Sequence, residues 1–160
     1  MLTFEQMLIR FVVALALGAL LGLERELVGK EAAGIRTLML VTSGASIFAM
    51  VALTIPYITA ATLGVVPDAT LLNSGFAILA NIVVGIGFLG AGLIIKTDNQ
   101  LKTNEQPHGV TTAALVWTAA AIGVLVGIGL SEFAVSAAVI IAILLYVLRT
   151  LNVSERFEKK

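Results

Sequence analysis

The sequence predicts an all-α polytopic membrane protein, a bundle of five transmembrane helices, and three observations lead to this fold class. The chain is 59% hydrophobic and only 12% charged, whereas soluble domains carry about 25% charged residues. Five apolar segments are each close to the ~20 residues that cross ~30 Å of hydrocarbon as a helix. The basic residues fall on every second connector between these segments, which is typical of multi-pass membrane proteins.

The five apolar segments cover residues 4–23, 37–56, 74–95, 110–130 and 133–151. Strands of a membrane β-barrel would be about half as long and would alternate in polarity, so helices are favoured. We expect one transmembrane domain over residues 1–151 and a short cytoplasmic tail over 152–160. The first segment is expected to stay uncleaved, because removing it as a signal peptide would leave a basic connector on the outside.

The connectors predict the orientation of the chain. Three basic residues lie between the first and second segments, two lie between the third and fourth, and four occur from Arg149 onward. The other two connectors contain no Lys or Arg. The positive-inside rule therefore predicts that the amino terminus lies outside and the carboxyl terminus lies in the cytoplasm.

Composition argues against several classes of function. The chain has no cysteine and one histidine, which excludes disulfide frameworks, thiol catalysis and the usual tetrahedral zinc sites. Its net charge is zero and no basic cluster indicates nucleic acid. No acidic or histidine side chain lies in the middle of a predicted helix, where a proton relay or cation carrier usually places one. We therefore expect no enzyme, no cofactor and no metal site.

A glycine-rich run, NIVVGIGFLGAG, lies at residues 81–92 of the third segment. Its Gly85-x-Gly87-x-x-Gly90 spacing matches a dinucleotide-binding fingerprint, but no acidic residue follows at the required distance of about 20 positions. We favour a membrane helix with a glycine face, since small residues let helix backbones approach closely. The same helix-packing role is predicted for Gly18, Gly22, Gly34, Gly85, Gly87, Gly90, Gly92, Gly123 and Gly127.

The first connector holds six charged side chains within thirteen positions, from Glu24 to Arg36. One interpretation is that they are boundary charges that snorkel to the membrane surface and set the topology. The other is a paired Glu/Arg cluster that docks a partner or lines a polar vestibule. A topology signal alone does not need three glutamates. Asn81, placed near the outer end of the third segment, is expected to hydrogen-bond to a neighbouring helix.

Four motifs, in order and at family-like spacing, closely resemble the MgtC/SapB family of bacterial inner-membrane proteins. They are the GLERE run at 22–26 followed by Lys30, AGIRT at 33–37, the glycine run at 81–92, and GVTTAA with Trp117 at 109–117. Carried over by position, the family's polar motif residues are Glu24, Arg25, Glu26, Lys30, Arg36, Asn81, Thr111 and Thr112. Its structural glycines are Gly34, Gly85, Gly87, Gly90 and Gly92.

The resemblance implies a non-catalytic regulatory or interaction protein linked to magnesium homeostasis or membrane energetics. The family is associated with growth at low magnesium and with virulence, and its best-known member is thought to bind the membrane sector of the F-type ATP synthase. Expected partners are the lipid bilayer, a second copy in a homo-oligomer (dimer), and another membrane protein such as an ATP synthase membrane subunit. The alternative is a small oligomeric cation or solute transporter or channel.

The sequence departs from the family pattern at three places. Ala77 and His108 stand where many relatives carry a basic residue. The virulence-type relatives continue into a soluble cytoplasmic domain, whereas these residues end at Lys160. The resemblance therefore implies the family's transmembrane domain only.

Overall fold

A computed structural model of the chain describes residues 2–26, 33–97 and 109–151. The helices are α1 (Phe4–Glu26), α2 (Ile35–Leu63), α3 (Ala69–Thr97), α4 (Val110–Ile128) and α5 (Ser131–Thr150). All five are long and apolar enough to cross a membrane, and the described ranges contain no strand. The predicted five-helix membrane fold is confirmed, whereas the orientation of its termini stays a prediction.

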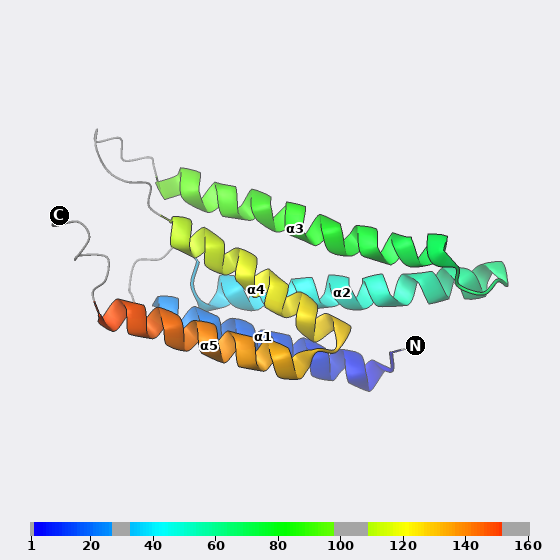
Figure 1. The fold of residues 1–160 in the computed structure, drawn as a ribbon, viewed down its shortest axis with the longest axis horizontal. Helices are drawn as coiled ribbons and strands as arrows, with labels where there is room; N and C mark the ends of the chain where they lie inside the picture. The colour runs from blue at the N-terminus through cyan, green and yellow to red at the C-terminus, as the bar shows by residue number, and fades with distance from the viewer. Residues whose placement is uncertain (1, 27–32, 98–108, 152–160) are drawn as a thin grey trace.

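The helices form three tiers, with α3 on one side, α2 and α4 in the middle, and α1 and α5 on the other side (Figure 1). The short helix α4 contacts all four other helices, and α2 contacts α1, α3 and α4. By contrast, α3 contacts only α2 and α4, and α5 contacts only α1 and α4. The centre of the bundle is therefore the α2–α4 pair.

Glycines bring α4 against α2 at backbone distance. A Cβ atom added at Gly127 would lie 2.6 Å from the carbonyl oxygen of Ser46 and 2.6 Å from the Cβ of Ala49. One turn earlier, Gly123 lies against the carbonyl of Thr42 just as closely. In a membrane, where lipid is as apolar as the helices, such close van der Waals packing drives helix association. The contact between α2 and α4 therefore depends on these two glycines.

Glycines also allow close backbone packing between α1 and the start of α2. A Cβ at Gly18 would lie 2.6 Å from the carbonyl oxygen of Leu38, and one at Gly22 would overlap the backbone of Ile35. The glycines of the 81–92 run in α3 behave differently. Gly90 has ordinary space beside Ala113, and three others have no atom of another helix within 4 Å, namely Gly85, Gly87 and Gly92. Within one chain, these three glycines are not needed for close packing.

Several hydroxyl groups of the inner helices bond to the backbone of their own helix. Thr42 Oγ1 donates to the carbonyl of Leu38 at 2.7 Å, and Thr118 Oγ1 donates to that of Ala114 at 2.8 Å. Ser46 Oγ is fully buried and has no hydrogen-bond partner among the described residues. Most of these hydroxyls are thus satisfied inside their helix and do not indicate a site.

The α2–α3 hairpin is longer than predicted. We expected α2 to end at Pro56 and α3 to begin at residue 74, but the helices extend to Leu63 and back to Ala69. Proline cannot donate to the carbonyl four residues earlier, which is that of Ala52. Gly75 of α3 lies so close to this carbonyl that a Cβ would not fit, and such packing lets membrane helices continue through proline.

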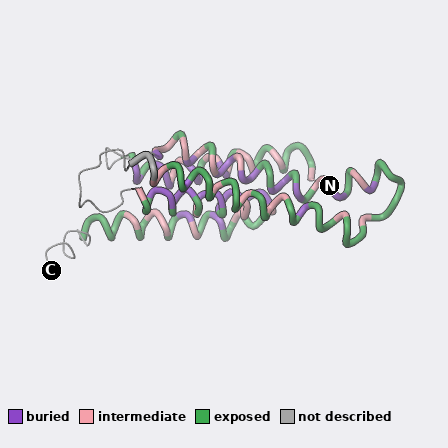
Figure 2. Tube along the Cα trace, turned by 90° about the horizontal axis from the view of Figure 1, so that it is seen from above, coloured by how far each residue is buried: buried purple, intermediate pink, exposed green. Residues whose placement is uncertain are grey.

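Each hairpin helix has 29 residues, about 43 Å of helix, which exceeds the ~30 Å hydrocarbon layer. The tip of the hairpin accordingly projects beyond the amino-terminal end of α1 and carries exposed residues (Figure 2). The turn between α4 and α5 comes about two residues earlier in the chain than predicted. The reason is that Gly129 adopts a left-handed φ of +99°, which ends α4 at Ile128.

The packing predicts unequal effects for two glycine substitutions. Gly123→Ala should lower the free energy of unfolding by about 1–3 kcal/mol, because its methyl group overlaps the α2 backbone. Gly87→Ala, the matched control, adds the same methyl group in open space and should cost nothing measurable. Thermal unfolding of both variants in detergent micelles tests this expectation, and equal losses would contradict it.

Candidate functional site

Glu24 and Arg25 form an ion pair in the last turn of α1. Arg25 Nε lies 3.2 Å from Glu24 Oε2, and the side chains are only 8% and 9% exposed, respectively. Neighbouring helix residues do not ordinarily face each other, and boundary charges that snorkel would lie in the solvent. This pair instead lies packed inside the end of the bundle. The burial of this pair does not match boundary charges that snorkel, and the docking role of the paired cluster stays a prediction.

Glu26 connects the end of α1 to the beginning of α2. Its Oε2 atom accepts a hydrogen bond from the backbone N–H of Ile35 at 3.2 Å. The N-cap residue Gly34 has no side chain to do this, and a Cβ at Gly34 would lie 2.9 Å from Glu26 Oε2. A carboxylate is favourable beside the positive end of a helix. Glu26 therefore fixes how α2 leaves the first helix.

Arg36 lies in the first turn of α2 and is exposed. We call Glu24, Arg25, Glu26 and Arg36 the polar corner; it lies at the end of the bundle where α1 ends and α2 begins (Figure 1). The corner thus combines a buried ion pair with an exposed carboxylate and an exposed guanidinium.

The remaining motif residues divide into three groups. In the first turn of α4, which begins at the same end of the bundle as the corner, Thr111 is exposed and Thr112 is 2% exposed. Lys30 lies outside the described residues. Asn81 lies far from the corner, in the body of α3. The structure therefore places Glu24, Arg25, Glu26 and Arg36 at one end of the bundle and Asn81 away from them.

Asn81 was predicted near the outer end of its helix, and that placement is wrong because α3 begins earlier, at Ala69. Asn81 is about 18 Å along the helix axis from this start and is exposed. The expected hydrogen bond to a neighbouring helix is also absent, since the amide bonds to none of the described residues.

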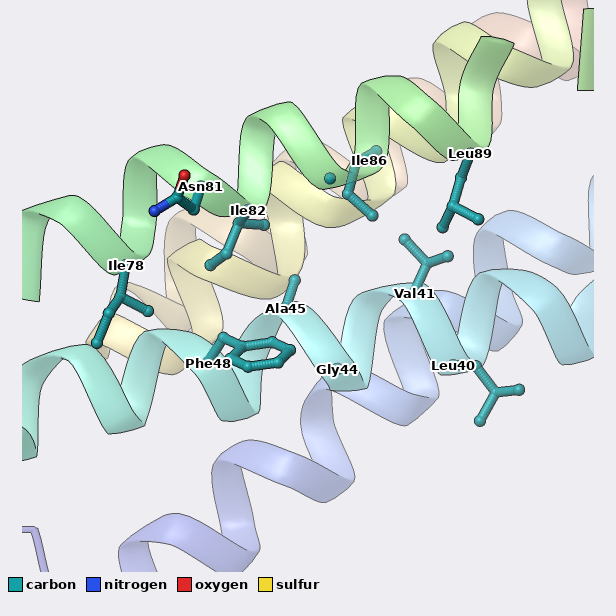
Figure 3. Close-up of a pocket in the computed structure, with 11 residues that line it drawn as sticks. Leu40, Val41, Gly44, Ala45, Phe48, Ile78, Asn81, Ile82, Ile86 and Leu89 are labelled. Carbon is teal, nitrogen blue, oxygen red and sulfur yellow. The ribbon is translucent and has the colours of Figure 1, made fainter. Parts of the chain in front are cut away.

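The side chain of Asn81 lines a cleft between α2 and α3 (Figure 3). The cleft has a volume of about 570 Å³ and is otherwise lined by apolar side chains and glycines. A second apolar cleft, of about 520 Å³, separates α3 from α4 beside Trp117. The middle of α3 is thus flanked by open space on both sides.

Two further observations bear on chemistry. The glycine run continues as α-helix without a break, so the strand–turn–helix context of a dinucleotide site does not occur there. Among the described residues, no group of three or more His, Cys, Asp or Glu side chains could hold a metal ion.

Sequence reasoning missed the long-range contact of Arg10. Its Nη1 atom donates to the carbonyl of Gly127 in α4 at 2.7 Å. The available signal was a single basic residue inside an apolar helix, which in membrane proteins indicates a specific partner.

The buried pair predicts unequal effects for two glutamates of the same turn. Glu24→Ala should lower the free energy of unfolding by about 3 kcal/mol, because it removes one partner of a buried ion pair. Glu26→Ala removes the same charge but only a capping hydrogen bond, and should cost about 1 kcal/mol. Denaturation in mixed micelles measures both, and a Glu24→Ala loss no larger than that of Glu26→Ala would contradict the prediction.

Comparison with known proteins agrees with these motifs. The sequence pattern of the MgtC family matches residues 11–154. Protein SrpB of Synechococcus elongatus is 35% identical over 130 residues, which cover 76% of this chain and 63% of SrpB. Protein MgtC of Salmonella typhimurium is 38% identical over 141 residues, which cover 88% of this chain and 51% of that protein.

The chain spans less than two thirds of the length of either relative, 63% of SrpB and 51% of MgtC. No solved structure matches it. The five membrane-spanning helices and the match over most of the sequence lead to one assignment. The chain is a multi-pass bacterial membrane protein that belongs to the MgtC family.

Proposed function

We propose that this protein is a non-catalytic regulator that binds other membrane proteins and is linked to magnesium homeostasis or membrane energetics. The observation that carries the proposal is the polar corner, in which a buried ion pair and a capping carboxylate support an exposed arginine. The similarity to protein MgtC supports the connection with magnesium.

The corner is built as a fixed surface. A buried ion pair contributes little net stability, because removing both charges from water offsets their attraction. The Glu24–Arg25 pair is therefore better explained by the geometry it maintains. Glu26 fixes the first turn of α2, and this turn presents Arg36.

The chemistry of Arg36 defines the partner group. A guanidinium binds a carboxylate through two parallel hydrogen bonds. Arg36 is exposed in the first turn of α2, at the end of the bundle that carries the polar corner. We infer that the corner binds an acidic side chain of a membrane partner. A second copy of the chain and a membrane subunit of the ATP synthase are the partners to test.

The α2–α3 cleft gives less support to the alternative, a cation or solute transporter. Magnesium prefers six oxygen ligands in octahedral geometry, and the cleft offers a single side-chain amide, that of Asn81, among apolar residues. A pathway along this cleft would leave the ion poorly coordinated. The regulator therefore stands as the first proposal.

Arg36→Ala should abolish complementation of a growth defect at low magnesium, because it removes the exposed donor group of the corner. Arg149→Ala is the matched control, since Arg149 is an exposed arginine at the same end of the bundle. The control variant should complement as well as the wild type, and both should reach the membrane in equal amounts. Full growth with Arg36→Ala would refute the role of the corner.

Purified protein reconstituted in liposomes should show no saturable magnesium flux above that of empty liposomes. The reason is the poor supply of oxygen ligands along the α2–α3 cleft. A fluorescent magnesium indicator inside the liposomes gives the measurement. Saturable flux that is lost in Arg36→Ala would replace the regulator with the transporter.

A further inference from the structure

Arg10 lies within the part of α1 that crosses the membrane. It is about 9 Å along the axis from the beginning of α1 at Phe4 and about 21 Å from Glu24 near the other end. With Glu24 at one boundary of a ~30 Å hydrocarbon layer, Arg10 lies about 9 Å inside the opposite boundary. A basic side chain at this depth needs a specific partner.

Arg10 contacts the end of α4 and the turn between α4 and α5. Arg10 Nη1 donates to the carbonyl oxygen of Gly127 at 2.7 Å. Arg10 Nη2 lies against Gly129, 2.8 Å from where a Cβ would be. The last carbonyls of a helix lack a donor within the helix, and hydrocarbon offers none. Arg10 therefore supplies a donor to the end of α4.

The hydrogen bond to the Gly127 carbonyl uses only one of the N–H donors of the Arg10 guanidinium. A guanidinium has five N–H donors and a full positive charge, and this carbonyl takes one of them. The acidic residues at this end of the bundle are Glu5, Asp68 and Glu132, and all three are exposed. None of them forms an ion pair with Arg10. Among the described residues, no acidic side chain thus neutralises the charge of Arg10.

We propose that Arg10, at the α4–α5 turn, binds the phosphodiester group of a glycerophospholipid from the adjacent leaflet. Guanidinium and phosphate match in charge and in bidentate geometry. Arg10 is partly exposed, and a long basic side chain reaches from hydrocarbon toward the headgroups. The site goes beyond the proposed function, because it lies at the opposite end of α1 from the polar corner.

Lipid-dependent thermal stability tests the proposal. Purified, delipidated full-length protein in detergent is mixed with phosphatidylglycerol or with diacylglycerol of the same acyl chains, which lacks the phosphate. Phosphatidylglycerol should raise the Tm of the wild type about 5 °C above that in diacylglycerol. Inorganic phosphate in millimolar excess should not reproduce the shift, since the site opens to the membrane.

Three variants separate this site from a purely structural cap. Arg10→Met and Arg10→Gln should lose the difference between the two lipids, whereas Arg10→Lys should keep most of it because it keeps the charge. Each variant is compared with itself in the two lipids, so a lower overall stability does not affect the result. Arg149→Met, a charge-matched control at the other end of the bundle, should keep the full difference.

Four results would overturn the assignment. The wild type could respond equally to diacylglycerol, or inorganic phosphate could give the same shift. Arg10→Met and Arg10→Gln could retain the preference for phosphatidylglycerol, which would leave Arg10 as a helix cap only. An equal loss in Arg149→Met would show an effect of net charge and not of a site.

Discussion

The fold depends on the backbone contact between α2 and α4. Gly123 and Gly127 have no side chain, so α4 approaches the carbonyls of Thr42 and Ser46 more closely than any other residue type would allow. Helices α2 and α4 then form the centre on which the other three helices pack. Because lipid removes the hydrophobic driving force between helices, this shape complementarity has to provide the association.

The charged side chains at the two ends of α1 have different kinds of partner. At one end, Glu24 and Arg25 are buried together, and Glu26 caps the next helix. At the other end, Arg10 of the apolar helix α1 donates to the carbonyl of Gly127 in α4. In both arrangements a charged side chain of α1 has a specific partner within the bundle. The Glu24–Arg25 pair contains its own counter-charge. Arg10, in our proposal, takes its counter-charge from the phosphate of a lipid.

Helix α3 packs loosely against the bundle along its middle. Apolar clefts flank its middle on both sides, and three of its glycines touch no other helix. Asn81 lines one cleft without a hydrogen bond to the described residues. The glycine run that dominates the sequence is thus outside the centre of the fold, while less conspicuous glycines of α1 and α4 hold the centre together.

Hydropathy and charge alone determined the number of helices, the membrane class and the charged motif from Glu24 to Arg36, because each is a property of local composition. Only the tertiary structure decided that Glu24 and Arg25 are buried and that Arg10 reaches Gly127. It also decided which glycines lie against a backbone and that α2 continues through Pro56. These features depend on residues far apart in the chain, and a linear pattern does not encode which helix faces lie side by side.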